Sequence, residues 1–113
     1  MHEMALCESA MQVIEQQAAQ NGVRRVTAVW LEVGALACVE ISALTFCFDA
    51  VSRNTLAEGC KLHVRVKPAQ AWCWDCCQTV VINQRGEACP HCQGYRLRVD
   101  DGETLRIQEI EVE

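Results

Sequence analysis

The sequence has no apolar run that approaches the length of a membrane-spanning helix, and it has no excess of basic residues. Its 10 Lys and Arg are outnumbered by 15 Asp and Glu, which gives a formal net charge of -5. Proteins that bind the phosphate backbone of nucleic acids usually carry a basic patch, so this acidity argues against a nucleic-acid partner. The sequence also lacks repeats and low-complexity segments. With 113 residues, half of them hydrophobic, it can form one compact domain or a small domain with a metal-held module.

We expect no secretion signal either, because Met1-His2-Glu3 is followed by neither a basic region nor a long apolar one. The nine cysteines are an odd number, so they cannot all be paired in disulfides within one chain. We therefore expect a reducing, cytoplasmic location without membrane insertion. In that setting four cysteines would hold a metal, and the others would be buried or free thiols.

Four of the cysteines form two Cys-x-x-Cys pairs, Cys73 with Cys76 and Cys89 with Cys92. Each pair lets two thiolates reach one ion from a tight turn, and two pairs complete a tetrahedral site of four sulfurs. Such a closed site leaves no open position for a substrate, so we predict that these residues bind a structural Zn(II) ion. Two disulfides, or unrelated thiols, are the alternative interpretation.

The remaining thiols do not indicate an enzyme. Cys77 could replace Cys76 after a small backbone shift, and His91 is expected to be a solvent-facing neighbour that could exchange onto the ion. Cys7 and Cys47 lie on or beside helical apolar stripes, which favours a role as small core residues. Cys38 and Cys60 have no paired spacing. A catalytic thiol needs a histidine partner, and no pairing with any of the three histidines can be inferred.

Apolar periodicity predicts an α+β fold. The final strand changes the parity of its apolar residues between Ile107 and Ile110, which indicates a bulge or a change of packing face. The first strand is apolar on both faces and is therefore expected at the centre of a sheet, with cover on both sides. The predicted helices are 4–20 and about 39–52, and the predicted strands are 24–33, 61–67, 79–82, 96–99 and 104–112.

The order of these elements places the cysteine pairs between two strands. We therefore expect a small domain of two helices on a three-stranded sheet, formed by residues 1–67 plus 100–113. The zinc ribbon would be an inserted module at residues 68–99. In the strand at 61–67 the side chains are expected to alternate. Leu62, Val64 and Val66 would point toward the core, and the other face, directed toward solvent, would carry Lys61, His63, Arg65 and Lys67.

The N-terminus is a second possible metal site. The Met1 amine, the His2 backbone nitrogen and the His2 imidazole can chelate one ion through adjoining five- and six-membered rings. Glu3 adds another backbone nitrogen and a carboxylate. Such nitrogen-rich, near-planar sets suit Ni(II) or Cu(II), and their affinity should rise with pH because the nitrogens must lose protons. The alternative is that His2 is a solvated residue that precedes a helix, and spacing alone favours this alternative over a metal site.

The combination of motifs resembles the HypA/HybF family over the full length of the chain. It consists of Met1-His2-Glu3 opening a helix, a strand that ends in Val-Gly, and Cys-x-x-Cys followed by Cys-Pro-x-Cys. Residues 67–76, which read Lys-Pro-Ala-Gln-Ala-Trp-Cys-Trp-Asp-Cys, are most similar to the enterobacterial HybF/HypA branch. Members of this family are nickel metallochaperones for the maturation of [NiFe]-hydrogenases.

The resemblance implies a nickel site at the Met1 amine, His2 and Glu3. Glu40 matches a family carboxylate that follows the first strand, although some members have aspartate there. The resemblance also places zinc on the four paired cysteines, with Cys77 as an extra thiol that many members lack. It implies a small nickel-binding domain with an inserted zinc ribbon, in agreement with the order of elements predicted above.

The implied activity is transfer rather than catalysis. Ni(II) would be held at the N-terminus and passed to the [NiFe]-hydrogenase large-subunit precursor with the help of a HypB-type GTPase. Two other functions compete with this one: a zinc-ribbon module for nucleic acid or protein, and a thiol redox module. The oligomeric state, monomer or homodimer, stays open. The basic residues that could form a nucleic-acid patch around the ribbon are Arg85, Arg96, Arg98 and Arg106.

Overall fold

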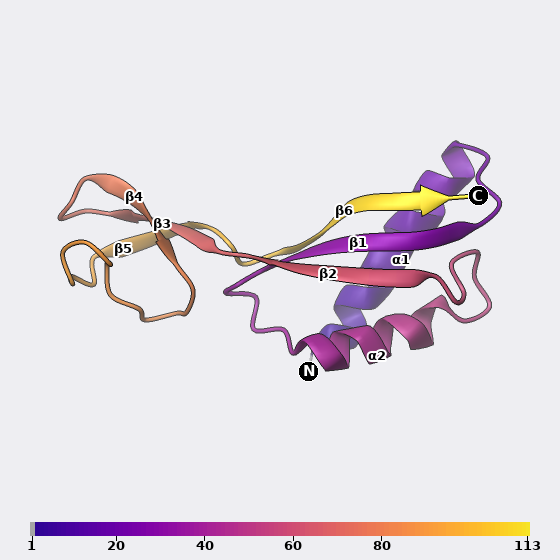
Figure 1. Ribbon diagram of the computed structural model, residues 1–113, viewed down its shortest axis with the longest axis horizontal. Helices are drawn as coiled ribbons and strands as arrows, with labels where there is room; N and C mark the ends of the chain where they lie inside the picture. Colours follow the sequence, from indigo (N-terminus) through magenta and orange to yellow (C-terminus); the bar gives the residue numbers. More distant parts are fainter. Residues whose placement is uncertain (1) are drawn as a thin grey trace. The chain divides into compact units, whose positions relative to one another are not determined.

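The computed structural model describes residues 2–113, which form two compact units (Figure 1). The helical unit consists of the residues up to Glu32, together with Val39–Arg65 and Arg106–Glu113. The ribbon unit consists of Val33–Cys38 and Val66–Leu105. The fold is α+β, with two helices and two three-stranded sheets.

Helix α1 spans Glu3–Gln20, close to the predicted range. Its buried face includes Cys7, Met11, Ile14 and Ala18, which recur at steps of three and four, so the predicted place of Cys7 on a helical apolar stripe is confirmed. The helix ends where the sequence indicates, since Gly22 has a φ of 65° and the Val23 N–H donates to the Ala18 carbonyl at 2.9 Å. A residue without a Cβ adopts this left-handed conformation at little cost.

Helix α2 spans Ile41–Ser52 and begins two residues later than predicted. The difference arises because Glu40 is extended, with φ -87° and ψ 118°, and caps the helix with its own side chain. Leu44, Cys47 and Phe48 form the buried face of α2. Ile41, the first residue of α2, is exposed and does not belong to this face.

The sheet of the helical unit has the strand order β2-β1-β6, with β1 at Val26–Gly34, β2 at Lys61–Lys67 and β6 at Leu105–Val112. The predicted central position of β1 is confirmed, and Figure 1 shows α1 crossing behind β1 and β6. On β1, Trp30 is only half-buried. Its ring stacks on that of His63 in β2, with centroids 4.6 Å apart and an interplanar angle of 15°.

In the outer strands β2 and β6, some side chains point in the predicted direction and others do not. The predicted inward direction of Val66 is wrong, since this residue is 54 % exposed. Lys67, expected to face solvent, is partly buried, and its Nζ lies 2.7 Å from Asp101 Oδ2. In β6, Leu105, Ile107 and Ile110 are the partly buried residues, so the predicted change of parity is confirmed.

The ribbon unit contains a strand that the sequence did not reveal, β3 at Ala69–Cys73. It is the central strand of the order β4-β3-β5, with β4 at Gln78–Ile82 and β5 at Leu97–Asp101. The strand was missed because three of its five residues are small and Pro68 marked an end to the preceding strand. Its alternation is visible in retrospect, because Ala69, Ala71 and Cys73 are fully buried.

The core of the ribbon is small and includes two of the paired cysteines. Its buried residues are Leu36, Ala69, Ala71, Cys73, Val80, Ile82 and Cys89. A core of this size stabilises a domain weakly, so a module of this kind usually depends on a metal or on disulfides. In the described part of the chain, neither helix is long and apolar enough to cross a membrane.

Candidate metal centres

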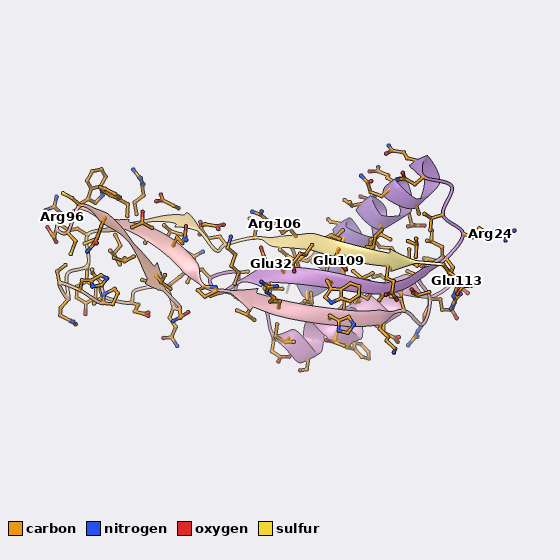
Figure 2. The ribbon with its side chains drawn as sticks, turned by 45° about the horizontal axis from the view of Figure 1, so that its top comes forward. Arg24, Glu32, Arg96, Arg106, Glu109 and Glu113 are labelled. Atoms are coloured by element: carbon orange, nitrogen blue, oxygen red, sulfur yellow. The ribbon has the colours of Figure 1, made fainter. Side chains whose placement is uncertain are left out.

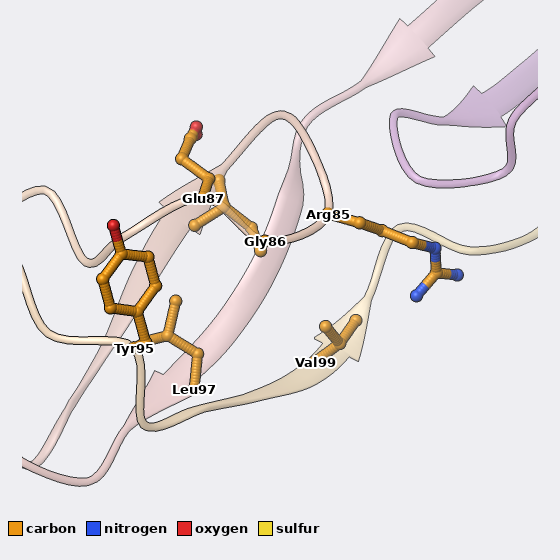
Figure 3. Close-up of a pocket in the computed structure, with 7 residues that line it drawn as sticks. Arg85, Gly86, Glu87, Tyr95, Leu97 and Val99 are labelled. Carbon is orange, nitrogen blue, oxygen red and sulfur yellow. The ribbon is translucent and has the colours of Figure 1, made fainter.

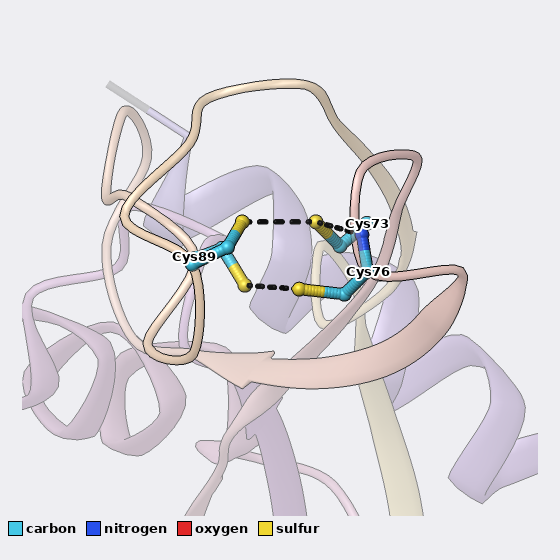
Figure 4. Close-up of side chains that lie close together, drawn as sticks. Cys73, Cys76 and Cys89 are labelled. Atoms are coloured by element: carbon cyan, nitrogen blue, oxygen red, sulfur yellow. Dashed lines mark hydrogen bonds between the residues drawn. The ribbon is translucent and has the colours of Figure 1, made fainter.

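The four paired cysteines converge on one point at the end of the ribbon sheet. Their sulfur atoms all lie within 4.8 Å of one another. The Cys73 and Cys92 sulfurs are 3.7 Å apart, and those of Cys76 and Cys89 are 3.8 Å apart. Figure 4 shows Cys73 and Cys76 facing Cys89 across the space between two loops. We call these residues the four-cysteine cluster.

The spacing of the cluster fits a tetrahedral metal site. A Zn–S bond of about 2.3 Å gives an edge of about 3.8 Å between sulfurs in a regular ZnS4 tetrahedron. The measured separations of 3.7 and 3.8 Å match that edge. A disulfide requires sulfurs about 2.05 Å apart, so the cluster is not arranged as two disulfides. The soft thiolate set and the closed geometry are consistent with structural zinc.

The two loops hold the sulfurs by similar backbone contacts. The Cys77 N–H donates to the Cys73 carbonyl at 2.8 Å, and the Gln93 N–H donates to the Cys89 carbonyl at 2.9 Å. Inside each loop a backbone N–H also points at the first sulfur, from Cys76 to Cys73 and from His91 to Cys89, both at 3.4 Å. Donors aimed at sulfur stabilise a thiolate more than a thiol.

The pKa values of two cluster thiols show how closely the sulfurs interact. Contact with Cys92, together with burial, raises the pKa of Cys76 to about 12. Burial acts in the same direction on Cys89, but N–H donors from Cys92 and His91 outweigh it and lower the pKa of Cys89 to about 6. The cluster therefore favours one thiolate readily, whereas full deprotonation requires a compensating cation.

Cys77 and His91 lie outside the cluster. The Cys77 side chain is exposed and its sulfur donates to the Trp74 carbonyl at 3.6 Å. Its backbone has a φ of 54°, the left-handed conformation that closes the first loop. His91 is exposed, as predicted. The possible replacement of Cys76 by Cys77 is thus not the arrangement that the structure adopts.

Three of the four arginines that could form a nucleic-acid patch, Arg85, Arg96 and Arg98, form ion pairs with neighbouring carboxylates. Arg96 Nη1 lies 3.0 Å from Asp75 Oδ1, and Arg98 Nε lies 2.9 Å from Asp100 Oδ1. Figure 2 labels Arg96 on the ribbon unit. Arg98 also covers the Trp74 ring, 5.5 Å from its centroid. Because these pairs remove most of the local positive charge, the ribbon has little of the basic field that binds phosphates.

A shallow pocket of about 230 Å³ lies on the ribbon apart from the cluster. Figure 3 shows the Tyr95 ring at one side of it and Arg85 extending away from it. The Arg85 guanidinium forms an ion pair with Glu103 and donates to the Leu36 carbonyl at 3.4 Å. The only carboxylate that lines the pocket, Glu87, accepts from the Asn83 N–H at 3.1 Å. The pocket therefore offers no set of metal ligands.

The helical unit brings two of the predicted nickel ligands together at the N-termini of its helices. Glu3 Oε2 accepts a hydrogen bond from the Glu40 N–H at 3.2 Å, although 37 residues separate the two in sequence. His2 is the exposed residue before α1, and its carbonyl accepts from the Leu6 N–H at 3.0 Å. Met1, whose amine is part of the predicted site, lies outside the described residues.

The Glu40 side chain is occupied as a helix cap. Its Oε2 accepts from the Ser42 hydroxyl at 2.6 Å and from the Ala43 N–H at 2.8 Å. Sequence reasoning placed Glu40 in the first turn of α2 but did not identify Ser42 as its partner. The two-residue spacing between an acidic residue and a serine was the available signal.

Both glutamates are held in the charged form by these hydrogen bonds. The Glu40 N–H is the largest cause that lowers the pKa of Glu3, with a smaller contribution from the nearby His2. The Ser42 hydroxyl is the largest cause that lowers the pKa of Glu40, followed by the N–H groups of Ala43 and Ser42. Two carboxylates thus stay ionised at the positive ends of two helices, where a cation alone would be disfavoured.

The other buried thiols belong to the packing between α1 and α2. Cys7 is fully buried and its sulfur donates to the Leu44 carbonyl at 3.4 Å. Burial, with a contribution from the nearby Cys47, raises the pKa of Cys7 to about 11. A thiol of this kind is a poor nucleophile at neutral pH. The prediction that Cys7 and Cys47 are core residues is confirmed.

The fold and the four-cysteine cluster together define a small α+β protein with a zinc ribbon. Comparison with known proteins gives the family. The model of the family described as "Hydrogenase/urease nickel incorporation, metallochaperone, hypA" matches residues 1–112. The chain therefore belongs to the HypA/HybF family of nickel metallochaperones.

Relatives and solved structures agree with this assignment. The chain is 58 % identical to the "Hydrogenase maturation factor HybF" of Salmonella typhimurium over 113 residues, which is 100 % of both chains. It has the same identity and coverage with the factor of the same name from Escherichia coli K12. The fold is similar to the solution structure of the Ni metallochaperone HypA from Helicobacter pylori, with a TM-score of 0.75 at 19 % identity, covering 99 % of this chain and 97 % of that one. The resemblance to the enterobacterial HybF branch is confirmed.

Proposed function

We propose that this protein binds Ni(II) at its N-terminus and delivers it to the [NiFe]-hydrogenase large-subunit precursor in the cytoplasm, acting with a HypB-type GTPase. It would act as a carrier and not as an enzyme. One observation carries the proposal within this nickel-handling family: the Glu3 carboxylate, one residue from His2, is fixed by the Glu40 N–H. This contact joins two of the proposed site residues, Glu3 and Glu40, from the start of two helices.

The proposed ligands are the Met1 amine, His2 and Glu3. The first N–H groups of an α-helix have no carbonyl partner four residues earlier, so backbone nitrogens at this end are not committed to the helix ladder. Such nitrogens can lose their protons to solvent and then bind Ni(II). The carboxylates of Glu3 and Glu40 offset the positive helix ends, which would otherwise disfavour a cation. An open site of this kind can also release its metal to an acceptor, which a closed cage cannot do readily.

Glu40 is the less direct member of the proposed site. Ligation by its side chain would require the bonds to Ser42 and Ala43 to break, at the expense of the α2 cap. Its backbone N–H already positions Glu3 without that loss. Glu40→Gln keeps a capping oxygen and removes the charge. A large loss of nickel affinity in this variant would indicate that the Glu40 carboxylate binds the metal directly. A small loss would indicate that Glu40 only positions Glu3.

We further propose that Cys73, Cys76, Cys89 and Cys92 hold a resident Zn(II) ion. When bound, zinc would supply the positive charge that lets all four thiols ionise, and it would join the two loops. It would leave no open coordination position. In this proposal the ribbon, residues 68–99, is a separate structural module, and residues 1–67 plus 100–113 form the nickel-binding domain.

Nickel titration by calorimetry tests the N-terminal site. The zinc-loaded protein that begins at Met1 should bind one Ni(II) per chain. His2→Ala should weaken binding by at least about a hundredfold, or roughly 2.7 kcal/mol. One residue added before Met1 should have a similar effect, because it converts the amine into an amide. Unchanged nickel binding by the extended protein would rule out the proposed chelate.

A further inference from the structure

The helical unit has an apolar groove beside the edge of its sheet. The groove has a volume of about 550 Å³ and lies between α1 and β6. Val13 and Val112, one on each side, are 45 % and 46 % exposed. The residues that line the groove are Val13, Gln17, Asn21, Val23, Ile107, Gln108, Glu109, Ile110 and Val112.

One wall of this groove is an edge strand. In the order β2-β1-β6, only one side of β6 is paired with a strand of the sheet. An edge strand presents backbone N–H and C=O groups that can pair with another extended chain. Natural edges are usually short, charged or covered. β6 carries charged residues, but it is eight residues long, and Ile107, Ile110 and Val112 lie beside an open groove that no described residue fills.

The charges along β6 indicate what would bind there. Glu109, Glu111 and Glu113 outnumber Arg106, and Glu109 also lines the groove. Figure 2 shows Arg106, Glu109 and Glu113 following one another along this strand. A second copy of β6 would add three more glutamates to the same surface. A segment with lysine or arginine at alternate positions would instead complement it.

We infer that β6 and the α1 groove form a strand-addition site for an extended protein segment in which apolar residues alternate with basic ones. The segment would pair its backbone with the free edge of β6. Its apolar side chains would pack beside Val13 and Ile110. Its basic side chains would lie next to Glu109, which lines the same groove, and next to Glu111, whose Oε1 also accepts from the Thr27 hydroxyl at 3.1 Å. This surface uses none of the residues of the two proposed metal sites.

The test uses the full chain loaded with zinc and a short peptide, acetylated and amidated, in which valine alternates with lysine. Fluorescence anisotropy should show binding that weakens as salt is raised. In heteronuclear NMR, the amides of Leu105–Val112 should shift and become protected from exchange. A peptide of alternating valine and glutamate should bind at least about tenfold more weakly.

Two changes separate strand addition from loose electrostatic binding. N-methylation of the peptide along one edge should abolish binding, and N-methylation along the other edge should be tolerated, because only one edge pairs with β6. Val13→Asp should weaken binding by at least about tenfold. Gln12→Asp is the matched control, since Gln12 is exposed on a different part of α1, near Val51. It should bind as the parent protein does.

Charge reversal gives a test whose expected result is a change of peptide preference and not a loss of binding. Glu109→Lys combined with Glu111→Lys should reverse the preference, so that the valine–glutamate peptide binds more tightly than the valine–lysine peptide. Circular dichroism would verify that each variant is folded. The inference would be overturned if N-methylation had equal effects on both edges, if the NMR shifts mapped to the ribbon, or if β6 became protected through self-association alone.

Discussion

Cys77 illustrates how a single backbone angle separates two neighbouring thiols. Cys76 lies in the four-cysteine cluster, whereas Cys77 adopts a left-handed φ of 54° and its exposed sulfur contacts the Trp74 carbonyl. A residue with a Cβ is strained at such an angle. Its position is therefore explained by the geometry of the loop, in which its N–H closes the turn on Cys73.

Substitution of Cys77 should distinguish it from a ligand. Cys77→Gly should retain one zinc per chain and stabilise the ribbon by up to about 1 kcal/mol, because glycine removes the left-handed strain. Cys76→Ala should lose zinc and unfold the ribbon. Zinc content by atomic emission and thermal unfolding would measure both effects. Loss of zinc from Cys77→Gly would show that Cys77 takes part in coordination.

Glu40 should give the protein a defined sensitivity to acid. Its pKa is lowered from 4.5 mainly by the Ser42 hydroxyl, so the folded state favours the ionised form. The resulting stabilisation is fully present above the unfolded pKa and is lost as the pH falls through the lower folded pKa. We expect Glu40→Gln to lower the melting temperature at pH 7, with a difference from the parent that shrinks below pH of about 4.5.

Melting curves recorded over a series of pH values would check this expectation. Glu58→Gln is a useful control, because Glu58 Oε1 accepts from the Asn54 N–H in a loop and does not cap a helix with its charge. A difference between parent and Glu40→Gln that stayed constant from pH 3 to 7 would contradict the role of the charged cap.

At the scale of elements, the long periodic segments were predictable and the short strand was not. Both helices and the outer strands follow from apolar residues that recur at steps of three and four or of two. β3 could not be predicted in the same way, because Ala69 and Ala71 bury little apolar area and therefore give a weak pattern. Its burial is set by β4 and β5 on either side of it.

The candidate sites were predictable to different degrees for a physical reason. A Cys-x-x-Cys pair needs only local turn geometry, so the spacing alone identified the four-cysteine cluster. The contact between Glu3 and Glu40 depends on the packing of α1 against α2 across 37 residues of sequence. The capping role of Glu40 was not predicted either. The predicted helix begins at about residue 39, which places Glu40 inside the helix and not at its N-cap.

A glycine contact in the ribbon unit leads to a prediction about β3. Gly102 has a φ of 110°, and a Cβ at this position would lie 2.5 Å from the Ala69 Cβ. Gly102→Ala should therefore destabilise the ribbon by about 1–3 kcal/mol, through steric overlap added to backbone strain. Gly86→Ala is the matched control, because its φ is 79° but no atom lies within 4 Å of the added Cβ.

Chemical denaturation of the zinc-loaded protein would compare these two variants. Both variants should lose stability because alanine is strained at a positive φ. Only Gly102→Ala should lose further stability, because its new Cβ would overlap Ala69. Equal losses in the two variants would show that the contact with Ala69 contributes little. Amide exchange of β3 would locate the additional loss in this strand.

At the scale of the whole molecule, the two compact units should respond differently to the removal of zinc. The core of the ribbon unit is small and contains Cys73 and Cys89, whereas the helical unit has its own buried residues on α1, α2 and β1. Structural zinc contributes about 10–16 kcal/mol in small peptides, which exceeds the stability of an ordinary small domain.

A strong chelator should therefore unfold residues 66–105 and leave the helices in place. We expect the helical circular dichroism signal to persist while NMR dispersion is lost for β3, β4 and β5. Zinc added back should restore the dispersion. Simultaneous loss of both sets of signals would show that the two units unfold as one.

Because the nine thiols differ in burial, the number that reacts rapidly with an alkylating reagent should depend on whether zinc is bound. Alkylating reagents attack thiolates, so exposed Cys38 and Cys77 should react first, and buried Cys7 and Cys47 should react last. The four cluster cysteines would be protected with zinc and reactive without it. The number of rapidly modified thiols, counted by intact mass, would then report the zinc occupancy of each preparation molecule by molecule.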